Sequence, residues 1–175
     1  MNKLVFLIGF MGTGKTTIST SLGAYLSCEV KDTDQMIVDM EKRSIAKIFE
    51  TNGEEYFRDL ETRCLQELDS SALSIISCGG GIVLRNQNVD IMREKGINVL
   101  LTAEPVTILN RIKNDKNRPL LQGRMKEEYI TELLERRKKF YENAADISIS
   151  TDDKTTDEII CEIVKEIKRT EEIHV

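Results

Sequence analysis

The chain has 175 residues, of which 40% are hydrophobic, and it carries a formal net charge of −5 at pH 7. That length and apolar content suffice for one sizeable core, so we expect a single domain. No stretch approaches the ~20 apolar residues that a membrane-spanning helix needs, which argues against an integral membrane protein.

The cysteines and the single histidine bear on metal binding and on the redox compartment. Cys28, Cys64, Cys78 and Cys161 are scattered, form no Cys-x-x-Cys pair, and lie far in sequence from His174. This spacing argues against a zinc site and favours reduced thiols in a cytoplasmic protein. The chain also runs directly into its first expected strand, so we expect no cleavable signal peptide.

An apolar run at residues 4–8 predicts a buried strand of a parallel sheet, and residues 9–16 then fit Gly-x-x-x-x-Gly-Lys-Thr, the phosphate-binding loop or P-loop. Glycines permit backbone shapes that turn N–H groups inward around an anion. Lys15 adds a charge for the β- and γ-phosphates, and the Thr16 hydroxyl can ligate Mg²⁺. A plain glycine-rich turn is the alternative. However, a helix expected over 15–26 completes the context that the motif requires and favours phosphate binding.

Expected strands and helices alternate along the rest of the chain. Further strands are expected over residues 29–34, 73–77, 97–101 and 145–150. Further helices are expected over residues 35–40, 44–50, 54–68, 86–95 and 127–141, and two more begin near Pro105 and Thr155. Such alternation is typical of an α/β protein in which helices cover both faces of a parallel sheet. Ligands of such sheets bind at the carboxyl ends of the strands.

Several element boundaries are predicted by single residues. Ser44 is a plausible N-cap, and Gly53 is expected to end the helix that Ser44 begins. Pro105 suits the first turn of a helix, and Thr155-x-x-Glu158 fits a capping box. Residues 114–124 have no apolar period, so we predict a mobile loop there.

Two carboxylates, Asp32 and Asp34, end the second expected strand. Two residues apart on an extended chain, they would point the same way, so both could face a ligand at the edge of the sheet. P-loop enzymes need an acid to hold Mg²⁺ or its water shell, and the third strand supplies none. For Asp34 the alternative is a helix N-cap with a spare surface acid.

A glycine triplet, residues 79–81, follows the third expected strand. Three glycines let a substrate approach the backbone closely, and the location at a strand end favours that use. A flexible turn is the alternative.

Residues 111–139 are unusually basic. They contain ten of the 25 basic residues and five acids, so this segment carries +5 and the remainder −10. Nucleic acid is the obvious partner for a basic patch, but no aromatic platform accompanies it and the whole chain is acidic. A basic segment that faces a polyphosphate fits better, and solvated helix charge explains Lys138 and Lys139.

With these residues in place, the chain resembles the shikimate kinases, small P-loop kinases of the nucleoside-monophosphate-kinase-like group, over nearly its whole length. The matching pieces are residues 8–16, Asp32-Thr33-Asp34, 44–49, Gly53-Glu54, Phe57-Arg58, Glu61, 79–81, Arg111, Arg118-Pro119-Leu120-Leu121, Arg137 and Tyr141. The P-loop alone indicates only a nucleotide. The combination with Asp-x-Asp, Phe-Arg, the glycine triplet and Arg-Pro-Leu-Leu is far more specific.

The resemblance implies a three-layer α/β/α fold with a five-stranded parallel sheet in the order 2-3-1-4-5. It implies one P-loop kinase domain over 1–175, with a substrate-binding helical region at about 33–62 and a mobile lid at about 112–125. The implied reaction is ATP-dependent phosphorylation of the 3-hydroxyl of shikimate, with Mg²⁺, on the cytoplasmic chorismate pathway to aromatic amino acids. The expected partners are therefore ATP and shikimate, without nucleic acid or membrane, and we expect a monomer.

The resemblance also implies a role for each matching residue. ATP would be bound by Gly12, Thr13, Gly14, Lys15, Thr16, Thr17, Arg111, Arg118 and Asp153. Shikimate would be bound by Asp34, Arg58, Gly79, Gly80, Gly81 and Arg137. Thr16 and Asp32 would hold Mg²⁺, and the catalytic residues would be Lys15, Asp34 as candidate base, and Arg118 on the lid.

Arginine suits the proposed carboxylate-binding role, because its planar group of donors can pair bidentately with a carboxylate. On local grounds, however, Arg58 could instead form a helix-surface ion pair with Glu54 or Glu61. Arg137 lies in a run of four basic residues, and only its spacing from Tyr141 selects it.

Two departures from the family pattern are modest: Ser19-Thr20 stands where many relatives have a small residue and an arginine, and Val30-Lys31 replaces a more apolar strand end. Two other functions fit part of the pattern. A kinase for gluconate or a nucleotide would share the P-loop and the lid but not the paired arginines with the glycine triplet. A non-catalytic nucleotide-binding module would have no use for the lid arginine and the acids.

Overall fold

The structure, a computed structural model, describes residues 4–113 and 127–173. Within these residues, five parallel strands form one sheet in the order β2-β3-β1-β4-β5, as expected. The strands are β1 (Leu4–Ile8), β2 (Glu29–Asp32), β3 (Ser74–Ser77), β4 (Gly96–Thr102) and β5 (Ile147–Ser150).

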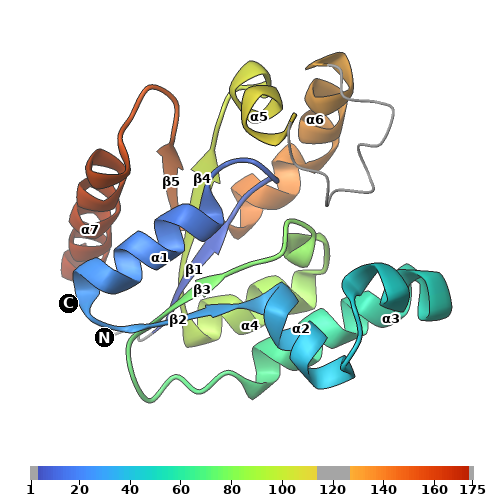
Figure 1. The fold of residues 1–175 in the computed structure, drawn as a ribbon. Coiled ribbons are helices and arrows are strands. Elements are labelled where there is room, and N and C mark those ends of the chain that lie inside the picture. The colour runs from blue at the N-terminus through green and yellow to red at the C-terminus, as the bar shows by residue number, and fades with distance from the viewer. Residues whose placement is uncertain (1–3, 114–126, 174–175) are drawn as a thin grey trace.

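Helices cover both faces of this sheet (Figure 1). They are α1 (Lys15–Leu26), α2 (Thr33–Glu41), α3 (Ile45–Glu67), the 3₁₀ helix η1 (Ile82–Leu84), α4 (Asn86–Lys95), α5 (Pro105–Ile112), α6 (Glu127–Ala144) and α7 (Thr156–Ile173). Helices α1 and α7 pack on one face, and α4, α6 and the end of α3 pack on the other. The three-layer α/β/α arrangement is therefore confirmed. In the described part of the chain, no helix combines the length and the apolar character that crossing a bilayer requires.

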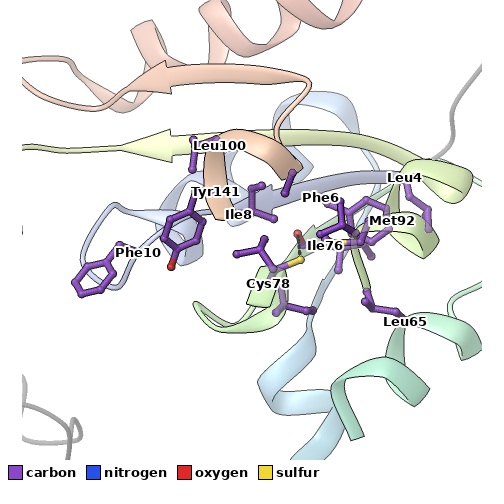
Figure 2. Packing of buried hydrophobic residues seen from close by; sticks show 14 of the residues in the cluster. Leu4, Phe6, Ile8, Phe10, Leu65, Ile76, Cys78, Met92, Leu100 and Tyr141 are labelled. Carbon is purple, nitrogen blue, oxygen red and sulfur yellow. Dashed lines mark hydrogen bonds between the residues drawn. The ribbon is translucent and has the colours of Figure 1, made fainter. Parts of the chain in front are cut away.

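Strand β1 lies at the centre of the sheet and supplies both cores. Val5 and Leu7 join the core under α1 and α7, whereas Leu4, Phe6 and Ile8 join the core under α4 and α6. Figure 2 shows the second core. Because successive side chains of a strand point to opposite faces, a strand that is covered on both sides reads as an unbroken apolar run.

The expected helix boundaries are largely confirmed. Gly53 has φ 82° and ψ 178°, so it interrupts the helical backbone inside α3. The Ser44 hydroxyl caps α3, and Pro105 opens α5. The Thr155 hydroxyl accepts the N–H of Glu158, whose carboxylate accepts the N–H of Thr155 in return, which is the expected capping box.

Other boundaries differ from expectation. Strand β2 ends at Asp32 and not at residue 34, because the Asp32 carboxylate caps α2 and starts the helix at Thr33. Helix α6 continues to Ala144, past the expected end at Tyr141. The predicted loop at 114–124, and the predicted lid apart from its first two residues, lie outside the described residues.

Gly23 allows α1 to approach β2 closely. A Cβ atom built on Gly23 would overlap the side chain of Val30. Glycine costs ~1 kcal/mol relative to alanine inside a helix, but at this position it allows α1 to pack closely on the sheet.

We expect Gly23→Ala to lower the melting temperature by about 2–4 °C, because overpacking costs more than the gain in helix propensity. The same change on a Val30→Ala background should lower it much less, since the overlapping side chain is gone. Thermal unfolding of the four proteins tests this. An equal loss in both backgrounds would place the cause elsewhere than in the contact with Val30.

Candidate active site

Residues 9–14 form the turn between β1 and α1. Gly9, Gly12 and Gly14 have φ of 145°, 77° and 95°, in the region that disfavours side chains. The Nζ atom of Lys15 donates to the carbonyl oxygens of Gly9 and Phe10, both at 2.9 Å. The ammonium group therefore lies over the turn, and the N-terminal end of α1 faces the same place.

A cavity of about 410 Å³ lies beside this turn. Its lining includes residues 12–17 of the turn and α1, Arg111 of α5, and Thr151 and Lys154 of the segment after β5. The Arg111 guanidinium donates to the Thr151 hydroxyl at 2.9 Å and to the Gly12 carbonyl at 3.2 Å. Arg111 thus connects the two walls of the cavity. Asp153 lies between the two lining residues of the segment after β5 and has φ 53°.

The carboxyl ends of three strands lie level at this edge of the sheet. Asp32 of β2 pairs in register with Ser77 of β3, and Ser77 pairs with Leu7 of β1. Asp32 therefore lies at the same edge as the P-loop. Its Oδ1 atom accepts the N–H groups of Asp34 and Gln35 at 3.0 and 3.1 Å, which fixes the orientation of the carboxylate.

Asp34 lies in the first turn of α2, so the prediction that it extends the strand and points with Asp32 is wrong. The helix forms there because Asp32, and not Asp34, is the N-cap. Asp34 nevertheless faces the end of β3: its Oδ1 atom is 2.5 Å from the position that a Cβ on Gly79 would occupy. The carboxylate packs where only a glycine leaves room.

The glycine triplet, called here the glycine segment (residues 79–81), is fixed on several sides. The N–H of Gly79 donates to the Thr33 hydroxyl at 2.9 Å. The Tyr141 hydroxyl donates to the carbonyl of Gly80 at 2.6 Å. A Cβ on the third glycine would overlap the Arg58 guanidinium. These contacts with α2, α6 and α3 describe a held segment and not a flexible turn.

Arg58 forms the ion pairs that its local sequence suggested, but it forms them in a buried place. Its Nη1 donates to Glu61 and its Nη2 to Glu54, both at 2.8 Å. The residue is only 9% exposed and Glu61 is fully buried. Burial raises the pKa of Glu61 to about 7, although Arg58 opposes this shift. The Oε1 atom of Glu61 is buried without a hydrogen bond to a described residue.

Arg137 and Tyr141 lie one turn apart on α6. The Arg137 guanidinium lies over the ring of Phe10, 5.9 Å from its centroid. Burial raises the pKa of Tyr141 to about 12, against the charges of Arg137 and Arg58. The positive charges of both arginines thus favour the ionised form of Tyr141. Figure 2 shows its ring in the core that also contains Phe10 and Cys78.

The structure therefore gathers most of the predicted site residues. The P-loop, Arg111 and Asp32 lie at one edge of the sheet, and Asp34 and Arg58 contact the glycine segment beside them. Arg118 lies outside the described residues. Sequence reasoning did not find the contact of Thr33 with the glycine segment, and its only signal was its place between the two aspartates.

The arrangement brings the P-loop, the Asp32 carboxylate and the Arg58 guanidinium to one edge of the sheet. The position for a Cβ on Gly80 is 3.6 Å from the Gly9 carbonyl, so the glycine segment adjoins the P-loop.

Comparison with known proteins agrees with this geometry. The family model for shikimate kinase matches residues 11–168. The shikimate kinase of Caldanaerobacter subterraneus is 41% identical over 93% of this chain and 95% of its own, and that of Dehalococcoides mccartyi is 41% identical over 95% and 94%. A solved structure of shikimate kinase from Acinetobacter baumannii in complex with shikimate has a TM-score of 0.88 and 33% identity, covering 96% of this chain and 94% of its own. The chain belongs to the shikimate kinase family.

Proposed function

We propose that this protein transfers the γ-phosphate of ATP to the 3-hydroxyl of shikimate, a step on the pathway to chorismate and the aromatic amino acids. The observation that supports this most directly is the contact of the glycine segment with the P-loop on one side and with Asp34 and Arg58 on the other. A relative solved with shikimate has the same fold at 33% identity. Monomeric state and cytoplasmic location stay predictions.

On the nucleotide side, residues 12–17 bind the phosphates through backbone N–H groups and Lys15. Arg111 packs on the adenine, and Asp153 belongs to the segment that closes the same cavity. The 33–62 region binds the second substrate, and Arg118 on a lid at 112–125 neutralises charge on the transferring group. All of these parts belong to one kinase domain over 1–175.

Thr16 and Asp32 fit a magnesium site. Both supply oxygen atoms, which Mg²⁺ prefers, and Mg²⁺ takes few protein ligands because it keeps waters and substrate phosphates. The strand register sets Asp32 at the same edge as the P-loop, and its N-cap bonds orient the carboxylate. When bound, the ion would neutralise charge between the β- and γ-phosphates.

On the substrate side, Arg58 and Arg137 bind the carboxylate of shikimate, and the glycine segment adds a backbone N–H. Asp34 meets the hydroxyl groups and orients the attacking oxygen or takes its proton. Phosphoryl transfer depends on positioning and charge neutralisation more than on covalent help from the protein. The residues at this edge of the sheet supply both.

We expect the purified protein to form ADP from Mg²⁺-ATP with shikimate far faster than with gluconate or nucleoside monophosphates. A coupled assay that compares these acceptors at equal concentration measures this. Faster turnover with gluconate would assign a different sugar-acid kinase. Tight binding of ATP without turnover of any acceptor would indicate a nucleotide-binding module.

We expect Arg58→Lys and Arg58→Ala to raise the KM for shikimate at least about 30-fold, because the carboxylate of the substrate loses its guanidinium partner. The KM for ATP should change by less than about threefold, since the P-loop is untouched. Arg63→Ala is the control: Arg63 pairs with Glu67 on the exposed side of the same helix. An unchanged KM for shikimate in the Arg58 variants would remove Arg58 from the substrate site.

The protonation of Glu61 should appear in the stability of the protein. Its pKa is about 7 in the folded state and ~4.3 in an unfolded chain, so the folded state binds the proton more tightly. Proton binding by Glu61 therefore stabilises the folded state fully below pH ~4.3, and this stabilisation is lost as the pH rises through 7. We expect the melting temperature of the wild type, relative to Glu61→Gln, to fall between pH 5 and pH 8.

Thermal unfolding of both proteins across this range tests the expectation. Glu54→Gln is the matched control, because Glu54 also contacts Arg58 but its side chain is 65% exposed. A difference between wild type and Glu61→Gln that does not vary with pH would contradict a raised pKa.

A further inference from the structure

The two arginines of the proposed substrate site share a feature that their assigned roles do not use. Each has, one helical turn later, a buried residue with a hydroxyl group: Tyr141 follows Arg137 on α6, and Thr62 follows Arg58 on α3. Tyr141 is 5% exposed and Thr62 is 7% exposed. Residues four apart lie on the same face of a helix, so each hydroxyl shares its face with an arginine.

Both hydroxyl groups connect their helices to the glycine segment. The Tyr141 hydroxyl reaches it directly, with its 2.6 Å hydrogen bond to the Gly80 carbonyl. Arg137 and the second glycine are therefore joined through one side chain and one turn of helix.

The connection from Thr62 has more steps. Its hydroxyl lies 2.7 Å from Oδ1 of Asn88 and 3.1 Å from the carbonyl of Arg58, and its single proton favours the shorter contact. The Nδ2 atom of Asn88 donates to the Ile82 carbonyl at 2.9 Å, and the N–H of Ile82 donates to the Gly79 carbonyl at 3.1 Å. Asn88 is fully buried and both ends of its amide are used.

We propose that Tyr141 and Thr62 are positioning residues that hold the two arginine-bearing helices in register with the glycine segment. The inference rests on the proposed function, because it treats Arg58 and Arg137 as the groups that bind the substrate carboxylate.

Packing alone gives no reason for these hydroxyl groups. Apolar side chains of the same shape would fill the core without needing hydrogen-bond partners. Both connections end on carbonyl groups of the segment that contacts Arg58 and Asp34. Since a Cβ on Gly81 would overlap the Arg58 guanidinium, a small shift of this segment would move the guanidinium or open a gap. The two hydroxyl groups therefore fix the positions of α3 and α6 relative to the glycine segment.

Tyr141→Phe and Thr62→Val each remove one hydroxyl and keep the shape of the side chain. We expect each to raise the KM and the dissociation constant for shikimate about 5- to 20-fold, the usual effect of leaving a buried polar group without its partner. The kcat should change by less than about threefold and the KM for ATP by less than about twofold. Steady-state kinetics and titration calorimetry with shikimate measure these quantities.

Matched variants separate positioning from general destabilisation. Thr62→Ser keeps the hydroxyl that Thr62→Val removes, so its KM for shikimate should stay within about twofold of the wild-type value. Tyr25→Phe changes an exposed tyrosine on α1, and Thr170→Val removes a hydroxyl that bonds to a carbonyl four residues earlier on α7. Both should leave both KM values unchanged. If Tyr141→Phe or Thr62→Val lowers the melting temperature without changing the affinity for shikimate, the role is structural and the proposal is wrong.

A double variant tests whether Tyr141 acts through Arg137. With Arg137→Ala already present, Tyr141→Phe should raise the dissociation constant for shikimate by a clearly smaller factor than in the wild type, because only Arg58 is left to position. If the double variant raises the dissociation constant for shikimate by the product of the two single-variant factors, the proposal is wrong. The proposed function fails separately: a wild type that does not turn over shikimate refutes the function, whereas an active wild type with unaffected variants refutes only this inference.

Discussion

The arrangement of the candidate site depends on the contact between the Arg58 guanidinium and the backbone of Gly81, where a side chain would leave no room. A buried charge is costly unless it is paired and hydrogen-bonded. Glu61 and Glu54 pair with Arg58, and Gly81 leaves room for the guanidinium to lie against the backbone. Gly81 and Glu61 together therefore allow the Arg58 guanidinium to be buried beside the segment that follows β3.

The parallel sheet explains why the glycine segment lies beside the P-loop. The carboxyl ends of β1, β2 and β3 lie level, so the P-loop, Asp32 and the glycine segment emerge at one edge from strands that are adjacent in the sheet but distant in the chain. Helices then deliver the long side chains: α3 brings Arg58 and α6 brings Arg137. The sheet sets the positions of the P-loop, Asp32 and the glycine segment along the edge, and the helices set the positions of the two arginines relative to them.

Much of this could be predicted from the sequence, because the patterns are local. The apolar run of β1, the glycines of the P-loop and the break at Gly53 each follow from the residues concerned. The orientation of Asp34 could not, because it depended on which aspartate caps α2. The burial of the Arg58–Glu61 pair could not either, since an i,i+3 pair looks the same on a buried and on an exposed face of a helix. Only tertiary packing distinguishes the two.

The ion pairs of Arg58 do not exclude a role in substrate binding. A guanidinium has five N–H donors, and the hydrogen bonds to described residues use Nε and one donor each of Nη1 and Nη2. One N–H remains on each terminal nitrogen, which is the number that a carboxylate can accept from a single arginine. The glutamates hold the plane of the group, and its two remaining N–H groups have no hydrogen bond to a described residue. The ion pairs of Arg58 and the proposed binding of a carboxylate are therefore compatible, because they use different N–H groups of the same guanidinium.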